Sequence, residues 1–271
     1  MKELGKTGVR VPSIGMGTWE IGGYGRRDSS NDKEAIAALQ KGIELGMRLI
    51  DTAELYRAGH AEELVGEAIK AFPREKVFIV SKVHNTHLEY QELIQACHRS
   101  LERLQTDFID LYLIHFPSYR VPLRETMRAM EELVEQGMVR FIGVSNFPLH
   151  LMKEAQSSLG KTEIQADEAK YNLKCRYDEK DLLPYCQKGG ITLIAYTPLE
   201  EGSLANNKLL QEVGQRCGKT AAQVALNWLI CNENVITIPK AISPKHLEEN
   251  AAAMGWRISQ KDFDSLSAVF Q

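Results

Sequence analysis

The sequence predicts a single (β/α)₈ barrel, and its length, composition and pattern all point to it. The chain has 271 residues, which is long for a small domain and normal for one closed barrel. Hydrophobic residues make up 44% of it and charged residues 25%, a composition that supports a large buried core. Short apolar runs alternate with segments of helical period, and no Pro-rich or Ser-rich linker separates them. We therefore expect one domain over residues 1–271.

The elements follow one another in a regular order. Residues 1–12, with Gly5 and Gly8 between alternating segments, predict a short β-hairpin ahead of the barrel. Apolar runs rich in β-branched residues predict strands near residues 14, 49–50, 77–80, 111–114, 141–144, 164, 191–196 and 235–238. Continuous apolar character indicates that both faces of these strands are covered. Residues 259–270 predict an extra helix at the C-terminal end.

Capping residues mark the ends of several predicted helices. Asn31 with Glu34 three residues later resembles a capping box before the first helix, and Gly46 is placed to end that helix. Gly137 is placed to end a helix in the same way, and Thr220 to begin another. The predicted pattern is therefore one helix after each strand.

Charge and cysteine usage restrict the class of protein. The formal net charge is -3 and no block of like charges occurs, so nothing predicts binding to nucleic acid or to a membrane surface. No stretch approaches the roughly 20 apolar residues that span a bilayer, and the N-terminus lacks a signal-peptide core, so we expect a cytoplasmic protein. The five cysteines are widely separated, which favours reduced, buried thiols. The expected partner is a small molecule, and no oligomerisation is predicted.

Four polar residues stand out because they follow apolar runs. Asp51, Lys82 and His115 come directly after a predicted strand or within two residues of its end, and Tyr56 lies five residues beyond Asp51. In a parallel barrel the active site forms at the carboxyl ends of the strands, so all four should meet at one rim. Singly, each also suits an ordinary role as a helix cap, an ion-pair partner, a core-edge aromatic or a satisfied histidine. Their shared placement favours an active site.

These four residue types together suit proton transfer. The ordinary pKa of tyrosine is about 10, too high for efficient acid catalysis at neutral pH, and the Lys82 ammonium is expected to lower the pKa of Tyr56. Asp51 is expected to keep Lys82 charged, because a desolvated ammonium without a counter-charge tends to lose its proton. His115 is expected to orient or polarise a carbonyl oxygen through an N–H group.

Six motifs resemble those of the aldo-keto reductase family. They are LGKTGVRV at 4–11, IGMGTW at 14–19, IDTAELY at 50–56, DLYLIHFP at 110–117, GVSNF at 143–147 and IPK at 238–240. The resemblance covers nearly the whole chain and implies a TIM barrel that reduces a carbonyl substrate to an alcohol, reversibly and without a metal. It implies NADPH/NADP⁺ as cofactor, with NADH possible, and places Asp51, Tyr56, Lys82 and His115 at the positions of the family's catalytic tetrad.

The resemblance also implies residues that bind the cofactor and the substrate. The cofactor positions are Gly17, Thr18, Asp51, Ser145, Asn146, Glu168, Tyr196, Thr197, Pro198, Leu199, Ser203, Lys240, His246, Glu249 and Asn250. Ser145 and Asn146 are implied to bind the carboxamide, and Tyr196 to stack on the nicotinamide ring. Trp19 and Phe116 are expected to form an apolar wall for the substrate beside Tyr56 and His115.

Two places depart from the family's pattern. Glu168 stands where a glutamine usually binds the carboxamide, with Asp167 in place of the usual asparagine, and a carboxylate donates no hydrogen bond unless it is protonated. Ala241 and His246 stand where a serine and an arginine usually grip the adenosine 2′-phosphate, so a hydroxyl and a bidentate guanidinium are missing. We expect NADPH binding with a weakened preference over NADH.

Other functions are less favoured by the residues present. A nucleotide-binding, redox-sensing or regulatory subunit with little turnover is the main alternative, and the intact tetrad argues against it. A metal-dependent lyase or hydrolase lacks a ligand set, since His84 and His87 have no carboxylate nearby in sequence. Residues 214–220 resemble a phosphate-binding loop but are one residue too short. The short loops at the barrel mouth predict an open site with broad substrate use.

Overall fold

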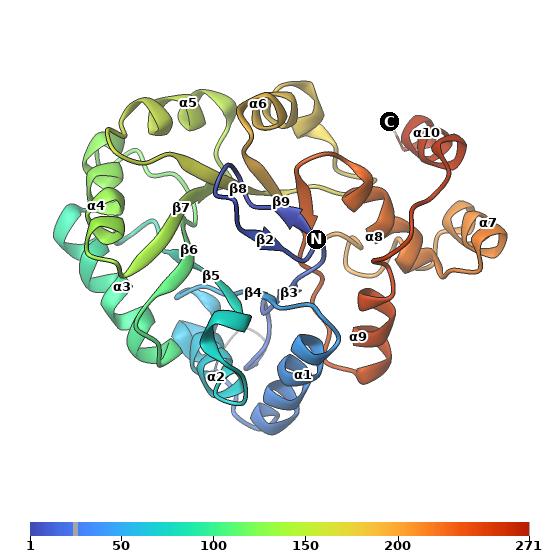
Figure 1. Ribbon diagram of the computed structural model, residues 1–271, viewed down its shortest axis with the longest axis horizontal. Helices are drawn as coiled ribbons and strands as arrows, with labels where there is room; N and C mark the ends of the chain where they lie inside the picture. Colours follow the sequence, from blue (N-terminus) through green and yellow to red (C-terminus); the bar gives the residue numbers. More distant parts are fainter. Residues whose placement is uncertain (24–26, 271) are drawn as a thin grey trace.

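Eight parallel strands form a barrel inside a ring of helices, in a computed structural model that describes residues 1–23 and 27–270 (Figure 1). The strands pair in chain order: β3 (Met16–Gly17), β4 (Leu49–Asp51), β5 (Phe78–Val83), β6 (Ile109–Ile114), β7 (Val139–Ser145), β8 (Ile164–Lys170), β9 (Thr192–Tyr196) and β10 (Val235–Thr237). A parallel bridge between Ile14 and Thr237 joins the first strand region to the last. The predicted barrel is confirmed.

The N-terminal hairpin closes one end of the barrel. It consists of β1 (Lys2–Glu3) and β2 (Arg10–Val11), which pair antiparallel and lie across the barrel axis (Figure 1). Leu4 and Val11 are buried and pack against the apolar residues inside the barrel. The Lys2 ammonium donates to the backbone carbonyls of Asn232 and Val235, at 2.5 and 2.6 Å. The predicted hairpin is confirmed, and it covers the end of the barrel opposite the carboxyl termini of the strands.

Ten α-helices and three short 3₁₀ helices accompany the strands in the part of the chain that the structure describes. They are α1 (Asp32–Glu44), η1 (Tyr56–Gly59), α2 (His60–Ile69), η2 (Arg74–Lys76), α3 (Tyr90–Leu104), α4 (Leu123–Glu135), α5 (Leu149–Ser157), η3 (Tyr177–Lys180), α6 (Leu182–Gly189), α7 (Lys208–Cys217), α8 (Ala221–Cys231), α9 (Pro244–Ala251) and α10 (Gln260–Val269). The expected C-terminal helix is α10. Strand β9 is followed by two helices, α7 and α8, where one was predicted. Within the described residues, no helix combines the length and the apolar character needed to cross a membrane.

The four predicted helix boundaries are confirmed, and the capping hydrogen bonds predicted at one of them are not. Gly46 and Gly137 follow α1 and α4 with φ of 94° and 74°, the left-handed conformation that glycine adopts without strain. Thr220 begins α8 and forms a capping box with Gln223. The capping box predicted at Asn31 is wrong, because the Asn31 side chain makes no cap hydrogen bond. Its backbone, at φ -117° and ψ 20°, is not in the extended conformation typical of a side-chain cap.

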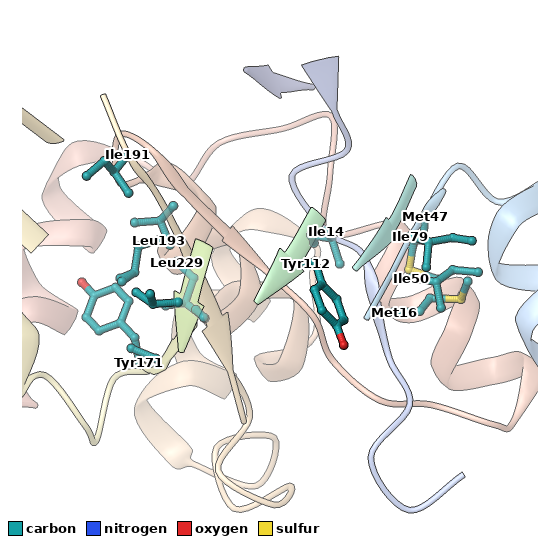
Figure 2. Packing of buried hydrophobic residues seen from close by; sticks show 14 of the residues in the cluster. Ile14, Met16, Met47, Ile50, Ile79, Tyr112, Tyr171, Ile191, Leu193 and Leu229 are labelled. Atoms are coloured by element: carbon teal, nitrogen blue, oxygen red, sulfur yellow. The ribbon is translucent and has the colours of Figure 1, made fainter. Parts of the chain in front are cut away.

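The strands carry two separate apolar cores because their side chains alternate between the faces. Inward-facing residues such as Leu49, Val80 and Leu111 fill the barrel interior. Outward-facing residues pack beneath the helices in a larger cluster, part of which Figure 2 shows around Ile79 and Tyr112. The interior is therefore solid, as expected for eight strands, and leaves no passage from end to end.

The cysteines are only partly as predicted. All five are free thiols, and Cys97 and Cys186 are buried. Cys175 and Cys231 are half-buried and Cys217 is exposed, which corrects the expectation that all are buried. Cys217 is the last residue of α7, the helix that the sequence analysis did not predict.

Candidate active site

A layer of polar side chains lies directly above the apolar barrel interior. Asp51, Lys82, His115, Glu168 and Tyr196 each stand two positions after an apolar residue of the inner core. Since alternate residues of a strand face the same side, all five point inward at the carboxyl ends of their strands. All but Tyr196 are buried. The prediction that Asp51, Lys82 and His115 share one rim is confirmed, and Glu168 and Tyr196 join them.

Lys82 is the centre of this layer. Its ammonium donates hydrogen bonds to Asp51 Oδ1 at 2.5 Å, to the Thr52 carbonyl at 3.1 Å and to Tyr56 Oη at 3.1 Å. It also lies 3.3 Å from Glu168 Oε1. Burial on its own lowers the pKa of Lys82, but the carboxyl groups of Asp51 and Glu168 outweigh that effect and raise it. Lys82 is therefore a permanent cation, as expected.

Lys82 lies within strand β5 and not after it. The apolar run ends at Val80, yet the strand continues to Val83 because its polar residues find buried partners. Ser81 faces outward and donates to Glu62 Oε1 at 2.5 Å, while Lys82 faces inward. An apolar run thus predicts the core of such a strand but not its functional end.

Tyr56 begins the 3₁₀ helix η1, just above Lys82. Its ring makes an edge contact with Trp19 at 5.0 Å and with His115 at 5.6 Å between ring centroids. Burial raises the pKa of Tyr56, and although the Lys82 ammonium opposes this, the pKa stays above its ordinary value. The prediction of a lowered pKa is therefore wrong: Lys82 does lower the pKa of Tyr56, but desolvation raises it by more. Tyr56 holds its proton at neutral pH.

His115 is a neutral imidazole in this site. Burial, together with the nearby Lys82 and His84, lowers its pKa to about 2. Its Nδ1 is buried and, among the described residues, has no hydrogen-bond partner. The ring stacks on Phe116 at 4.5 Å between centroids, and Phe116 is 37% exposed at the barrel mouth. A neutral imidazole offers an N–H donor without adding a second positive charge beside Lys82.

Ser145, Asn146 and Tyr196 form a hydrogen-bonded group at the ends of β7 and β9. The Tyr196 hydroxyl donates to Asn146 Oδ1 at 2.9 Å, and Asn146 Nδ2 donates to the His115 carbonyl at 3.0 Å. The Ser145 hydroxyl donates to the backbone carbonyl of Glu168 at 2.9 Å. These contacts tie the residues that the sequence assigned to the carboxamide to the polar layer.

A cleft of about 660 Å³ opens over this layer. Predicted site residues that line it are Gly17, Trp19, Asp51, Tyr56, Glu168, Tyr196, Thr197, Pro198, Leu199, Lys240, His246, Glu249 and Asn250. Thr18, Lys82, His115, Phe116, Ser145, Asn146 and Ser203 are predicted site residues outside this lining set; Ser203 accepts a hydrogen bond from Lys174 at 2.9 Å. Glu20, Glu201, Gly202, Ala205, Ala222, Ile238 and Pro239 also line the cleft. Of these seven residues, Ile238 and Pro239 belong to one of the six motifs, and the other five carry no signal in the sequence.

The far end of the cleft carries the cations predicted to meet a phosphate. Lys240 and His246 line the cleft there, and Lys240 Nζ lies 3.8 Å from Glu20 Oε2. The Ser243 hydroxyl accepts from the His246 backbone amide at 3.3 Å and so caps α9. Ala241 adds no hydroxyl. This end therefore offers one lysine and one histidine, and the lysine already has a carboxylate close by.

Strained backbone gathers around the cleft. Asn146 and Thr197 have φ of 60° and 51°, and each directly follows a barrel strand. Arg57 and Ala58, next to Tyr56, have φ of 53° and 54°. Left-handed conformations of residues other than glycine cost free energy and persist where their surroundings fix them, commonly at functional sites. Their position here supports the cleft as the functional site.

His84 and His87 lie at the rim with a carboxylate beside them. Glu54 Oε1 is 3.0 Å from His87 Nδ1 and accepts from the His84 backbone amide at 2.6 Å. This partner comes from the loop after β4, far from the histidines in sequence, so sequence proximity did not reveal it. Within the described parts of the chain, no group of three or more His, Cys, Asp or Glu side chains has the arrangement of a metal site.

Known proteins that resemble this chain combine the same fold with reductase activity. The model of the Aldo/keto reductase family matches residues 13–270. Methylglyoxal reductase YeaE of Escherichia coli is 41% identical over 97% of this chain and 92% of its own, and glyoxal reductase of Bacillus subtilis is 38% identical over 97% and 90%.

Solved structures that resemble this chain are also aldo-keto reductases. The thermostable aldo-keto reductase Tm1743, in complex with epalrestat, has a TM-score of 0.95 and 46% identity over 99% of this chain and 98% of its own. An aldo/keto reductase from Klebsiella pneumoniae, in complex with NADP and acetate, has a TM-score of 0.87 and 38% identity over 96% and 92%. With the polar layer, the cleft and these matches in agreement, the chain belongs to the aldo/keto reductase family.

Proposed function

We propose that this protein, as a single barrel domain, uses NADPH to reduce aldehydes and ketones to alcohols. The observation that carries the proposal is the contact of Tyr56 Oη with the Lys82 ammonium at 3.1 Å, at the floor of a cleft of about 660 Å³. Asp51, 2.5 Å from Lys82, supplies the counter-charge. Proton donation beside a redox cofactor is the chemistry that carbonyl reduction requires.

The residues of the cleft fit a nicotinamide nucleotide. Tyr196 offers an aromatic face to the cleft, and Lys240 and His246, which also line it, offer a positive charge and an N–H donor for a phosphate. Relatives crystallised with NADP or NADPH support this cofactor. When bound, the reduced nicotinamide supplies a hydride for the carbonyl carbon.

The protein's own groups complete the reaction at the carbonyl oxygen. His115, as a neutral imidazole, donates an N–H to that oxygen and orients it. As the hydride arrives at carbon, negative charge develops on oxygen, and Tyr56 donates its phenolic proton there. Lys82 stabilises the phenolate that remains, and Asp51 holds Lys82 in place. In the reverse direction the phenolate accepts the alcohol proton.

The mouth of the cleft suits small carbonyl compounds. Trp19 is 50% exposed and contacts the Tyr56 ring, and Phe116 stacks on His115, so two aromatic side chains border the proton donor. Relatives named for methylglyoxal and glyoxal reduction support small aldehydes as substrates. We propose broad activity on short aliphatic and aromatic aldehydes.

The Tyr56→Phe variant tests the proposal. It removes one oxygen and leaves the ring contacts with Trp19 and His115, so cofactor affinity should change little. The loss of a general acid should lower kcat by about 10²-fold or more. Consumption of NADPH with methylglyoxal measures kcat, and quenching of tryptophan fluorescence measures binding. Equal kcat in both proteins would exclude Tyr56 as the acid, and cofactor binding without turnover in the wild type would favour a sensor.

A further inference from the structure

Two buried carboxyl groups share one ammonium at the floor of the cleft. Lys82 Nζ lies 2.5 Å from Asp51 Oδ1 and 3.3 Å from Glu168 Oε1, and the two acidic side chains are 2% and 3% exposed. Glu168 Oε2 is buried and has no N–H or O–H donor among the described residues. Two carboxylates and one cation would leave a net negative charge in a desolvated site, which is costly.

The Asp51 and Glu168 carboxyl groups approach the same Lys82 ammonium, so they lie close enough to influence each other's protonation. Two carboxyl groups can form a hydrogen bond with each other only when one of them carries a proton. Burial and the charge of Asp51 raise the pKa of Glu168, while Lys82 lowers it by less. The floor of the cleft thus holds one lysine, one carboxylate and one carboxylic acid, with no net charge.

We propose that Asp51 and Glu168 share a single proton and release it when an oxidised, positively charged nicotinamide occupies the cleft. The inference rests on the proposed function. Tyr56, Tyr196 and Glu168 all line the cleft, so these residues would hold a nicotinamide ring if it binds over the polar layer. The cationic ring then supplies the charge that the proton supplied before, and the proton leaves to solvent. A reduced ring is uncharged and leaves the proton in place. No electrons move in this binding step.

The other titratable groups around the pair have pKa values far from neutral pH. Lys82 on β5, Tyr56 on η1 and Tyr196 on β9 all have raised pKa values and stay protonated at neutral pH. His115, beyond β6, has its pKa lowered to about 2 and carries no extra proton to lose. A cationic ring also favours ionisation of Tyr56, so the proton is assigned to the Asp51 and Glu168 pair only where its release disappears in Glu168→Gln.

The experiment counts protons as cofactor binds to the intact protein. Weakly buffered protein with a pH-indicator dye is titrated with NADP⁺ and separately with NADPH, and binding is followed by tryptophan fluorescence. Both cofactors carry the 2′-phosphate, so its own titration cancels in the difference. We expect up to about one more proton released with NADP⁺. As the pH rises through the range in which the pair is protonated, the Kd for NADP⁺ should fall by up to about tenfold per pH unit. The Kd for NADPH should not show this pH dependence.

Two variants locate the proton. Glu168→Gln removes the second carboxyl group, and it should abolish the difference in proton release and the pH dependence of NADP⁺ binding. Asp167→Asn is the matched control, because Asp167 is the adjacent buried carboxyl group and faces away from the cleft toward Cys186 on α6. It should keep both properties.

The outcomes separate the two proposals. Failure of both cofactors to bind would overturn the proposed function. Binding of both with equal proton release, and with the same pH dependence, would overturn the shared proton alone. Unchanged proton release in Glu168→Gln would also overturn it. If that variant does not fold, the comparison of NADP⁺ with NADPH on the wild-type protein decides.

Discussion

Replacing Lys82 by methionine tests how strongly its charge supports the Tyr56 phenolate. Methionine has a similar length and no charge, so the main change is the loss of an ammonium 3.1 Å from Tyr56 Oη. With an effective dielectric constant of about 20, an attraction over that distance is worth about 5 kcal/mol, or roughly four pKa units for the phenol. The nearby Asp51 cancels part of this effect. We therefore expect the pKa of Tyr56 to rise by at least about one unit in the variant.

The oxidation of an alcohol by NADP⁺ reports this shift, because Tyr56 must then be ionised to accept the proton. Activity is lost as the pH falls below the pKa of the phenol, and a higher pKa moves that loss to higher pH. The assay is kcat against pH for the wild type, Lys82→Met and Lys82→Arg, the last of which keeps the charge. A midpoint in Lys82→Met within about 0.3 units of the wild-type value would refute the electrostatic role of Lys82.

Further predictions concern the phosphate end of the cleft and acid stability. The ratio of kcat/KM for NADPH to that for NADH should stay below about 1000-fold, since among the described residues that line the cleft Lys240 is the one lysine or arginine. His246→Arg should raise that ratio by about tenfold by restoring a bidentate donor, and no change would place the phosphate elsewhere. His115 has a pKa of about 2 in the fold against about 6.5 when unfolded, so the unfolded chain binds more protons between these values. Urea unfolding should therefore show a loss of about 2 kcal/mol from pH 7 to pH 5 that His115→Asn lacks; equal losses in both proteins would contradict it.

The barrel was predictable because its strands are short and apolar on both faces, which leaves few other arrangements. Helix α7 was not predictable from that pattern, because a second helix after β9 lies outside the ring and adds no strand. The cap at Asn31 failed for a local reason: residue type permits a capping hydrogen bond, but backbone conformation decides whether it forms.

The part of the site that lies at the ends of predicted strands could be predicted from the sequence. Asp51, Lys82 and His115 follow apolar runs and meet at one rim, and the alternation beyond Ala166 also aims Glu168 inward. The contact of Glu168 with Lys82 depends on the distance across the barrel between β8 and β5, which one sequence does not give. The pKa of Tyr56 was missed because the charge of a neighbour is visible in a sequence and the depth of burial is not.

The N-terminal hairpin covers one end of the filled barrel, so the site is accessible only from the opposite end. Any molecule that reaches Tyr56 must enter and leave on the side away from Leu4 and Val11. The nucleotide and the carbonyl compound therefore bind through the same opening, one after the other. Met1 is 60% exposed and precedes the hairpin that covers the opposite end of the barrel. A tag or a fusion partner attached at Met1 would therefore not block the opening of the cleft.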